Sequence, residues 1–304
     1  MRKRLWMMTA AVIAAGIMGL SGCSKDNSGS RGQAAETQAG PAGEQDSEPA
    51  GQKAETDAAG EETGDQLAQI QQKGEIVVAM EGTWSPWTYH DESDQLVGYD
   101  VEVANLIAEK LGVKAVFVEG EWDGLFAGLD AGRYDIVVNG VEITKERGEK
   151  YDFTEPYAYI RTAIVVNGSN QEITSFEDLN GKNTANTISS TYAELAESYG
   201  ATVTGVDDLN QTFELLLSGR IDATLNAELT YYDYMKAHPD RDLKIAALTD
   251  EASLVSIPLR KGEESKRLKD AINEAIAEAG ESGKLAELSE KYFGSDISKN
   301  PQEN

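Results

Sequence analysis

Two segments of the chain repeat one pattern of residues. Residues 125–140 read LFAGLDAGRYDIVVNG, and residues 212–227 read TFELLLSGRIDATLNA. In each segment an apolar helical stretch leads through a Gly-Arg turn into a short strand with a polar tip, Asn139 in the first and Asn226 in the second. Repetition of one helix–turn–strand unit predicts two related lobes. Two strand tips that face each other across a cleft between lobes form a ligand site.

The chain around these segments alternates between strands and helices. Residues 75–80 (EIVVAM) and 114–119 (KAVFVE) are rich in β-branched side chains, which is typical of strands. Residues 100–112 place apolar side chains on one helical stripe and end in a glycine, which is typical of an amphipathic helix. This alternation predicts an α/β fold.

The expected first lobe comprises residues 67–160 and 253–298, and the expected second lobe comprises residues 161–252. The apolar run TAIVVNG at residues 162–168 is expected to carry the chain into the second lobe. The run SLVSIPLR at residues 253–260 is expected to bring it back.

The N-terminus has the pattern of a bacterial export signal. A basic stretch at residues 2–4 precedes an apolar run at residues 5–20, and LSGC follows at residues 20–23. This end resembles the lipobox of bacterial lipoproteins, which implies a signal peptide of residues 1–22 and lipidation of the thiol of Cys23. The alternatives are an ordinary signal peptide with an incidental cysteine, or a transmembrane anchor.

Residues 23–66 are expected to form a disordered tether behind the lipidated cysteine. After Cys23 this stretch contains no aromatic and no large apolar residue, so it cannot bury enough surface to fold. A flexible linker of this length has a root-mean-square reach of about 40 Å. We expect a lipid-anchored protein on the outer face of a Gram-positive membrane or in the periplasm, with a flexible tail at residues 299–304.

The composition argues against several classes of function. The formal net charge of −26 disfavours binding to nucleic acid or directly to anionic lipid. Cys23 is the only cysteine, and the two histidines, His90 and His238, are far apart in the sequence. We therefore expect no metal site, no cofactor and no catalytic triad.

Residues 136–147 combine a strand tip, a helix start and two opposite charges. The run Ile-Val-Val ends in Asn139-Gly140, and Thr144 is the expected N-cap of the next helix. Arg147 lies in the first turn of that helix, where backbone N–H groups favour anions, and its guanidinium matches a carboxylate with two donors. The alternative is a surface arginine paired with Glu146 or Glu149.

Three longer stretches resemble one family of binding proteins. GYDVEVANLIAEKLG, EWDGLFAGLDAGRYD and ITKERGEKYDFTEPY are similar to stretches of the solute-binding lipoproteins of polar amino-acid ABC importers, and EGTWSPWTYHD and KYFGSDISK look closest to cystine-binding members. The resemblance covers residues 67–298. It implies the two-lobed type II periplasmic-binding-protein fold with two hinge strands, a monomer that is not an enzyme, an amino-acid ligand and ABC permease subunits as partners.

The resemblance also implies roles for individual residues. Arg147 matches the arginine that holds the α-carboxylate of the ligand, and Thr191 matches the contact of the second lobe to that group. Gly140 matches a carbonyl that faces the ligand's ammonium. The remaining expected ligand-binding residues are the aromatic walls and their polar neighbours: Trp84, Trp122, Glu81, Asn139, Thr187, Ser190 and Asn226. Trp87, in contrast, is expected in the core.

Two positions depart from the pattern of the family. Glu142 stands where relatives have Ser or Thr, and Ala227 stands where they have an Asp that holds the α-ammonium. We hypothesise that Glu142 compensates for Ala227, because a buried ammonium without a partner is costly. Asn226 or Glu228 could instead fill the gap.

The expected function is capture of a polar amino acid, with L-cystine as the first choice, and its delivery to a permease. Another polar or cationic amino acid is the alternative ligand. A different class of function is an enzyme similar to cyclohexadienyl dehydratases, which have the same fold, with Glu142 as a general acid. The lipid anchor, the tether and the expected clamp at Arg147 argue against the enzyme.

Overall fold

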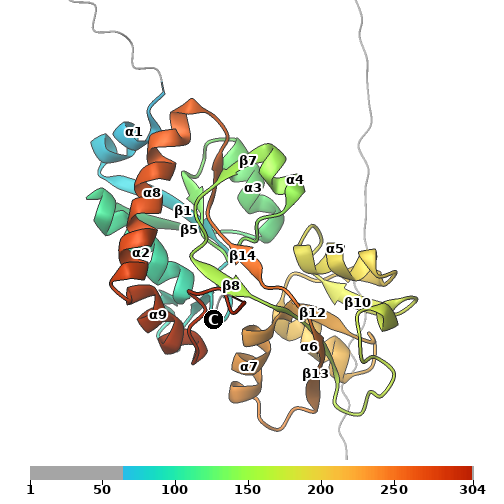
Figure 1. Ribbon diagram of the computed structural model, residues 1–304. Coiled ribbons are helices and arrows are strands. Elements are labelled where there is room, and N and C mark those ends of the chain that lie inside the picture. Colours follow the sequence, from blue (N-terminus) through green and yellow to red (C-terminus); the bar gives the residue numbers. More distant parts are fainter. Residues whose placement is uncertain (1–63, 303–304) are drawn as a thin grey trace, which may run out of the picture. The chain divides into compact units, whose positions relative to one another are not determined.

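The computed structural model describes residues 64–302 (Figure 1). The expected signal peptide, Cys23 and the tether up to residue 63 lie outside the described residues. No helix within residues 64–302 is long and apolar enough to cross a lipid bilayer.

The first sheet consists of three parallel strands in the order β5-β1-β6. Helices pack against it because their apolar stripes face the strands, and the predicted stripe of α2 is confirmed: Val103, Ile107 and Leu111 are buried. The strands are β1 (Glu75–Met80), β5 (Lys114–Glu119) and β6 (Ile136–Val137). The helices of this part are α1 (Gln66–Lys73), α2 (Tyr99–Leu111), α3 (Trp122–Asp130), α4 (Lys145–Lys150), α8 (Glu263–Glu281) and α9 (Lys284–Phe293). A small antiparallel sheet follows β1, with β2 (Thr83–Trp84), β3 (Thr88–His90) and β4 (Leu96–Val97).

The second sheet is antiparallel and has β9 at its centre. The order is β12-β9-β13, and a parallel pair, β10-β11, joins it through a bridge between Thr184 and Ala223. The strands are β9 (Thr162–Asn167), β10 (Asn183–Asn186), β11 (Thr202–Gly205), β12 (Thr224–Ala227) and β13 (Leu243–Leu248). The helices are η1 (Glu177–Leu179), α5 (Thr191–Ser198), α6 (Leu209–Leu217) and α7 (Glu228–Ala237).

Two antiparallel ribbons connect the sheets (Figure 1). They pair β7 (Tyr151–Phe153) with β15 (Pro258–Arg260), and β8 (Ala158–Ile160) with β14 (Ser253–Val255). Residues 162–168, expected to carry the chain into the second lobe, follow the connecting ribbon and do not belong to it. These residues build β9, whose first five residues are buried, as the central strand of a sheet requires, and the connection is the preceding strand β8.

The repeated segments have the same structure. In each, a helix ends before a glycine with positive φ, Gly132 or Gly219, and an aspartate then precedes the strand. Asp135 accepts a hydrogen bond from Val77 N on β1, and Asp222 accepts one from Asn183 N on β10, both at 2.8 Å. The prediction of two related α/β units is therefore confirmed at the level of individual contacts.

The ordered body starts earlier than residue 67. Asp65 is the N-cap of α1 and accepts a hydrogen bond from Ala68 N. Gln66 is buried, donates to the backbone oxygen of Asp135 and accepts from Ser265. The expectation that the tether extends to residue 66 is therefore wrong. A composition argument ignores capping and long-range hydrogen bonds, which recruit polar residues into a folded body.

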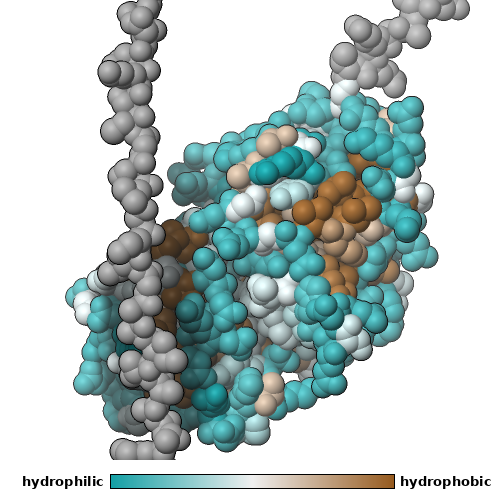
Figure 2. Space-filling model, turned by 180° about the vertical axis from the view of Figure 1, so that it is seen from behind, coloured by the Kyte–Doolittle hydropathy of each residue, from teal (hydrophilic) through white to brown (hydrophobic). Residues whose placement is uncertain are grey.

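The surface seen from behind is mostly hydrophilic, with apolar residues exposed in a few places (Figure 2).

Candidate functional site

A pocket opens between the carboxyl end of the first sheet and the second sheet, and it contains ≈ 680 Å³ of empty space including its mouth. The first sheet and its loops contribute Glu81, Thr83, Trp84, Trp122, Gly140, Glu142 and Arg147. The second contributes Asn186, Thr187, Ser190, Thr191, Tyr192, Val206, Asp207, Leu209, Thr212, Thr224 and Asn226. Of the side chains expected here, Asn139 and Glu228 are not on the wall.

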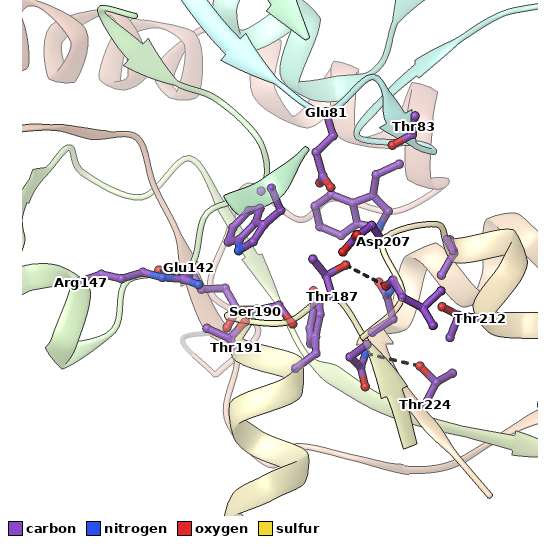
Figure 3. A pocket seen from close by; sticks show the side chains of 18 residues that line it. Glu81, Thr83, Glu142, Arg147, Thr187, Ser190, Thr191, Asp207, Thr212 and Thr224 are labelled. Atoms are coloured by element: carbon purple, nitrogen blue, oxygen red, sulfur yellow. Dashed lines mark hydrogen bonds between the residues drawn. The ribbon is translucent and has the colours of Figure 1, made fainter. Parts of the chain in front are cut away.

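Arg147 is held at one end of the pocket by its own helix (Figure 3). The predicted cap is confirmed, because Thr144 accepts a hydrogen bond from Arg147 N at 3.1 Å. The guanidinium donates to the backbone oxygens of Glu142 and Ser189 at 3.1 and 3.3 Å, and it lies 5.2 Å from the ring centre of Trp122. Among the described residues it forms no ion pair, so pairing with Glu146 or Glu149 is not observed.

Glu142 reaches across the cleft to the second lobe. Its carboxylate accepts a hydrogen bond from Thr191 Oγ1 at 3.0 Å, and the residue is only 7% exposed. Burial raises the pKa of Glu142, while hydrogen bonds from Ser253 and Thr191 and the charge of Arg147 lower it. Burial is the largest of these causes, so the pKa of Glu142 lies above its ordinary value.

Ser189 was not among the expected ligand-binding residues, yet it joins the two lobes beside Arg147. Its backbone oxygen accepts hydrogen bonds from Arg147 and from Trp122 Nε1, and its hydroxyl donates to Asp123. Ser189 has a φ of 63°, and the next residue, Ser190, is the N-cap of α5. The sequence shows a Ser-Ser-Thr run at a helix start, but nothing in that run indicates which of the three residues contacts Arg147.

Gly140 is the one position on this wall where only glycine fits. Its φ is +56°, and a Cβ there would lie 2.5 Å from Cζ3 of Trp84. Its N–H donates to Asp100 Oδ2 at 2.6 Å, and Asp100 also accepts from the Tyr157 hydroxyl at 2.8 Å. Burial raises the pKa of Asp100 to about 7, although both hydrogen bonds lower it.

The aromatic wall rests on the core. Trp84 stacks on Trp87 with a ring-centre distance of 5.3 Å and an interplanar angle of 18°. Trp87 is fully buried, which confirms the expected core position. Trp84 is therefore held as a rigid face of the pocket.

Asn139 positions Glu81 instead of lining the pocket. Its Nδ2 donates to Glu81 Oε2 at 2.7 Å, and its Oδ1 accepts from Glu81 N at 2.8 Å. Burial raises the pKa of Glu81 to about 7, with a smaller contribution from Asp207, while the bond from Asn139 lowers it. The expected ligand contact of Asn139 is corrected to this supporting role, because both polar ends of its amide are already engaged.

Glu228 does not reach the pocket either. It forms a two-point ion pair with Arg161, whose Nε and Nη2 lie 3.2 and 2.8 Å from its oxygens. Arg161 lies between β8 and β9, where the chain enters the second sheet. A nearby guanidinium thus engages the carboxylate, so Glu228 does not fill the gap at Ala227.

Several wall residues were missed by sequence reasoning: Thr83, Asn186, Tyr192, Val206, Asp207, Leu209, Thr212 and Thr224. The repeat held a signal for one of them. If it is extended toward the N-terminus, Trp122 aligns with Leu209, and each is the first residue of its helix and lies on the pocket wall. Within residues 64–302 no group of three His, Cys, Asp or Glu side chains could hold a metal ion.

Known proteins are similar to this chain over nearly all of the described residues. The family model "Bacterial extracellular solute-binding proteins, family 3" matches residues 76–295. L-cystine-binding protein TcyA of Bacillus subtilis is 41% identical over 237 residues, which is 78% of this chain and 87% of the relative. L-cystine-binding protein TcyJ of Escherichia coli K12 is 37% identical over 239 residues, 77% of this chain and 88% of the relative.

Solved structures show the same fold. An ancestral arginine-binding protein bound to arginine has a TM-score of 0.68 and 36% identity, covering 73% of this chain and 99% of that one. The L-cystine solute receptor of Neisseria gonorrhoeae in its unliganded open conformation has a TM-score of 0.54 and 40% identity, covering 77% and 99%. The two-lobed type II binding-protein fold expected from the sequence is thereby confirmed.

Proposed function

Because the chain belongs to family 3 of the bacterial extracellular solute-binding proteins, we propose that it captures a polar α-amino acid between its lobes and delivers it to an ABC permease. One observation carries the proposal. The Arg147 guanidinium lies on the wall of the pocket between the lobes, over an aromatic ring and without an acidic partner in an ion pair among the described residues. A guanidinium in such a place matches a free carboxylate of a ligand.

The α-carboxylate of the ligand binds Arg147 and the start of α5 at Ser190 and Thr191. These groups approach it from both lobes, so binding stabilises the closed arrangement. The carbonyl of Gly140 faces the α-ammonium. Trp84 and Trp122 cover the side chain of the ligand.

Glu142 supplies the negative charge for the α-ammonium. Ala227 is fully buried, is not on the pocket wall and offers no carboxylate. Glu142 is on the wall and is almost as deeply buried, so its charge acts in a poorly solvated site where it is strongly felt. This role supports binding, and we assign the residue no catalytic step.

L-cystine is the ligand we place first. Relatives named for L-cystine are 41% and 37% identical to this chain. The only cysteine of the sequence is Cys23, so the described residues contain no thiol that exchanges with a disulfide ligand. A cationic amino acid is the second choice, supported by the acidic groups Glu81 and Asp207 on the wall and by the arginine-bound structure of similar fold.

The cellular setting follows the same proposal. A lipid on Cys23 holds a monomer on the extracytoplasmic side of the membrane, and the tether lets its two lobes, residues 67–160 with 253–298 and residues 161–252, reach the permease.

A thermal-shift panel of amino acids on residues 64–304 tests the function. A ligand at 100 times its dissociation constant adds about 2.7 kcal/mol to the free energy of unfolding. We expect a shift with L-cystine that disappears when a reductant converts the ligand to cysteine. A panel in which no amino acid shifts the melting temperature contradicts the proposal.

A further inference from the structure

The two lobes of the structure are arranged more like those of a liganded protein than like those of an open one. The TM-score is 0.68 with the arginine-bound ancestral protein and 0.54 with the L-cystine receptor in its unliganded open conformation. The sequence identities, 36% and 40%, run in the opposite order, so sequence similarity does not account for the difference. Side chains that join the lobes here therefore show which contacts accompany closure.

On one flank of the pocket, Ser189 of the second lobe contacts three groups of the first lobe. Its backbone oxygen accepts hydrogen bonds from Arg147 and Trp122, and its hydroxyl donates to Asp123. The φ of Ser189 is 63°, a left-handed conformation that costs energy in a residue other than glycine. Strain of this kind persists where surrounding contacts hold it, and these contacts come from the opposite lobe. The conformation of Ser189 thus depends on contact between the lobes.

A second pair joins the lobes through a different helix. Ser85 lies in the first lobe, between β2 and β3, and its hydroxyl donates to Asp233 Oδ2 at 2.8 Å. Asp233 belongs to helix α7 of the second lobe. This pair has the same chemistry as the first, a serine hydroxyl on a carboxylate, but the serine is now on the first lobe and the acid on the second.

The two pairs lie on opposite sides of the second sheet. Ser189 directly precedes the N-cap of α5, and residues of α5 share a hydrophobic cluster with Ile164 and Val166 of β9. Residues of α7 share another cluster with Ala163 and Val165 of the same strand. Alternate residues of a strand point to opposite faces of its sheet, so α5 and α7 cover opposite faces.

Neither pair belongs to the wall of the pocket. The residues that line it do not include Asp123, Ser189, Ser85 or Asp233. A contact that the ligand does not touch, and that forms when the lobes close, stabilises the liganded protein by shifting the equilibrium toward the closed form. It acts on how long a ligand stays in the pocket, not on which ligand enters.

We propose that Ser189–Asp123 and Ser85–Asp233 are two latches that hold the lobes closed from opposite sides and set the dissociation rate of the ligand without touching it. The inference rests on the proposed function, because it assumes that an amino acid occupies the pocket when the lobes close. The open protein captures the ligand before the latches form, so the association rate does not depend on them. Removal of a latch changes the affinity by the same factor for every amino acid that binds.

Stopped-flow fluorescence of the full chain measures both rate constants, because Trp84 and Trp122 line the pocket. The ligand is L-cystine, or L-arginine if L-cystine does not bind. Asp123→Ala and Asp233→Ala are each expected to raise the dissociation rate constant about 3–10-fold, as for the loss of one hydrogen bond. The double variant should raise it about 10–100-fold, because the sites are far apart and act independently. The association rate constant should stay the same.

Each latch has a matched control. Glu121→Ala removes an exposed acid two positions from Asp123, at a helix start where its side chain makes no capping hydrogen bond. Asp240→Ala removes an exposed acid of the second lobe beyond the end of α7. Both controls should keep the rate constants of the parent protein. The melting temperature without ligand should be the same in all variants, since the latches form on closure. Ser85→Ala replaces Asp233→Ala if that variant does not fold.

The outcomes separate the latches from the function. Dissociation rates equal to those of the controls, or a change at one pair only, overturn the proposal. A fall in the melting temperature without ligand that matches the loss of affinity also overturns it, because the contacts then belong to the unliganded fold. In these cases the parent protein still binds, and the proposed function stands. If the parent protein binds no amino acid, the function falls and the latches with it.

Discussion

Two substitutions test whether Glu142 in the first lobe takes over the role of the acid that is absent at Ala227 in the second lobe. Glu142→Thr removes the buried carboxylate and places there the residue type typical of the resembled family. Ala227→Asp restores an acid at the end of β12. If Glu142 supplies the charge for the ligand's ammonium, the first change weakens binding and the second partly rescues it.

The structure sets the size of the expected effect. Removing one partner of a buried ion pair costs about 3–5 kcal/mol, and the open mouth of this pocket reduces that to about 2–4 kcal/mol. The dissociation constant should therefore rise about 30–1000-fold. Glu142→Thr should weaken ligand binding but increase the stability of the protein without ligand. Burial raises the pKa of Glu142, so its contribution to folding is lost as the pH rises through that raised pKa, and its removal stabilises the free protein on the alkaline side of it.

Ala227→Asp has a side effect that needs a control. Ala227 is the N-cap of α7 and makes no side-chain hydrogen bond there, so an aspartate also caps the helix, which contributes about 1 kcal/mol of stability. The position is fully buried, so the cost of burying the new carboxylate opposes that contribution in the protein without ligand. Ala227→Ser caps the helix without a charge. Affinity that returns with Asp but not with Ser comes from the carboxylate.

Calorimetry with L-cystine, or with whichever amino acid the thermal-shift panel identifies, gives the dissociation constants, and thermal melts without ligand give the stability. Compensation of Ala227 by Glu142 is refuted if the double variant binds no more tightly than Glu142→Thr alone. It is also refuted if Glu142→Thr binds as tightly as the parent protein.

Three further predictions concern the same pocket. Arg147→Ala should weaken binding by about 2–5 kcal/mol in calorimetry, with Arg147→Lys intermediate, and unchanged affinity would contradict the clamp. Gly140→Ala should lower the free energy of unfolding in urea by about 1–3 kcal/mol, because the new Cβ meets Trp84 at a φ of +56°, whereas Gly124→Ala, with no atom near its Cβ, should not. In the folded protein the pKa values of Glu81 and Asp100 are raised to about 7 from 4.5 and 3.8. The contribution of these two acids to the free energy of unfolding is therefore fully present below about pH 4 and is lost as the pH rises through 7. The melting temperature without ligand should fall between pH 5 and 8, and Glu81→Gln should flatten that fall.

The sequence by itself determined the local elements and the class of fold. The α2 stripe, the Thr144 cap, the helix that carries Arg147 and the repeated Gly-Arg-x-Asp turn follow from patterns within a few residues, and all appear in the structure. Hydrophobic periodicity and capping are local properties, so they can be read along the chain.

Only the tertiary structure determined which polar side chains form hydrogen bonds and ion pairs with one another. Asn139 lies at a strand tip, as predicted, but it binds Glu81, and Glu228 pairs with Arg161 at the connection between the sheets. Glu142 accepts a hydrogen bond from Thr191 across the cleft, although the two residues are 49 positions apart in the sequence. No local pattern encodes such pairings, because they depend on how elements from two lobes are brought together. Asn186 Oδ1 is buried without a hydrogen-bond partner among the described residues, which no local pattern indicates either.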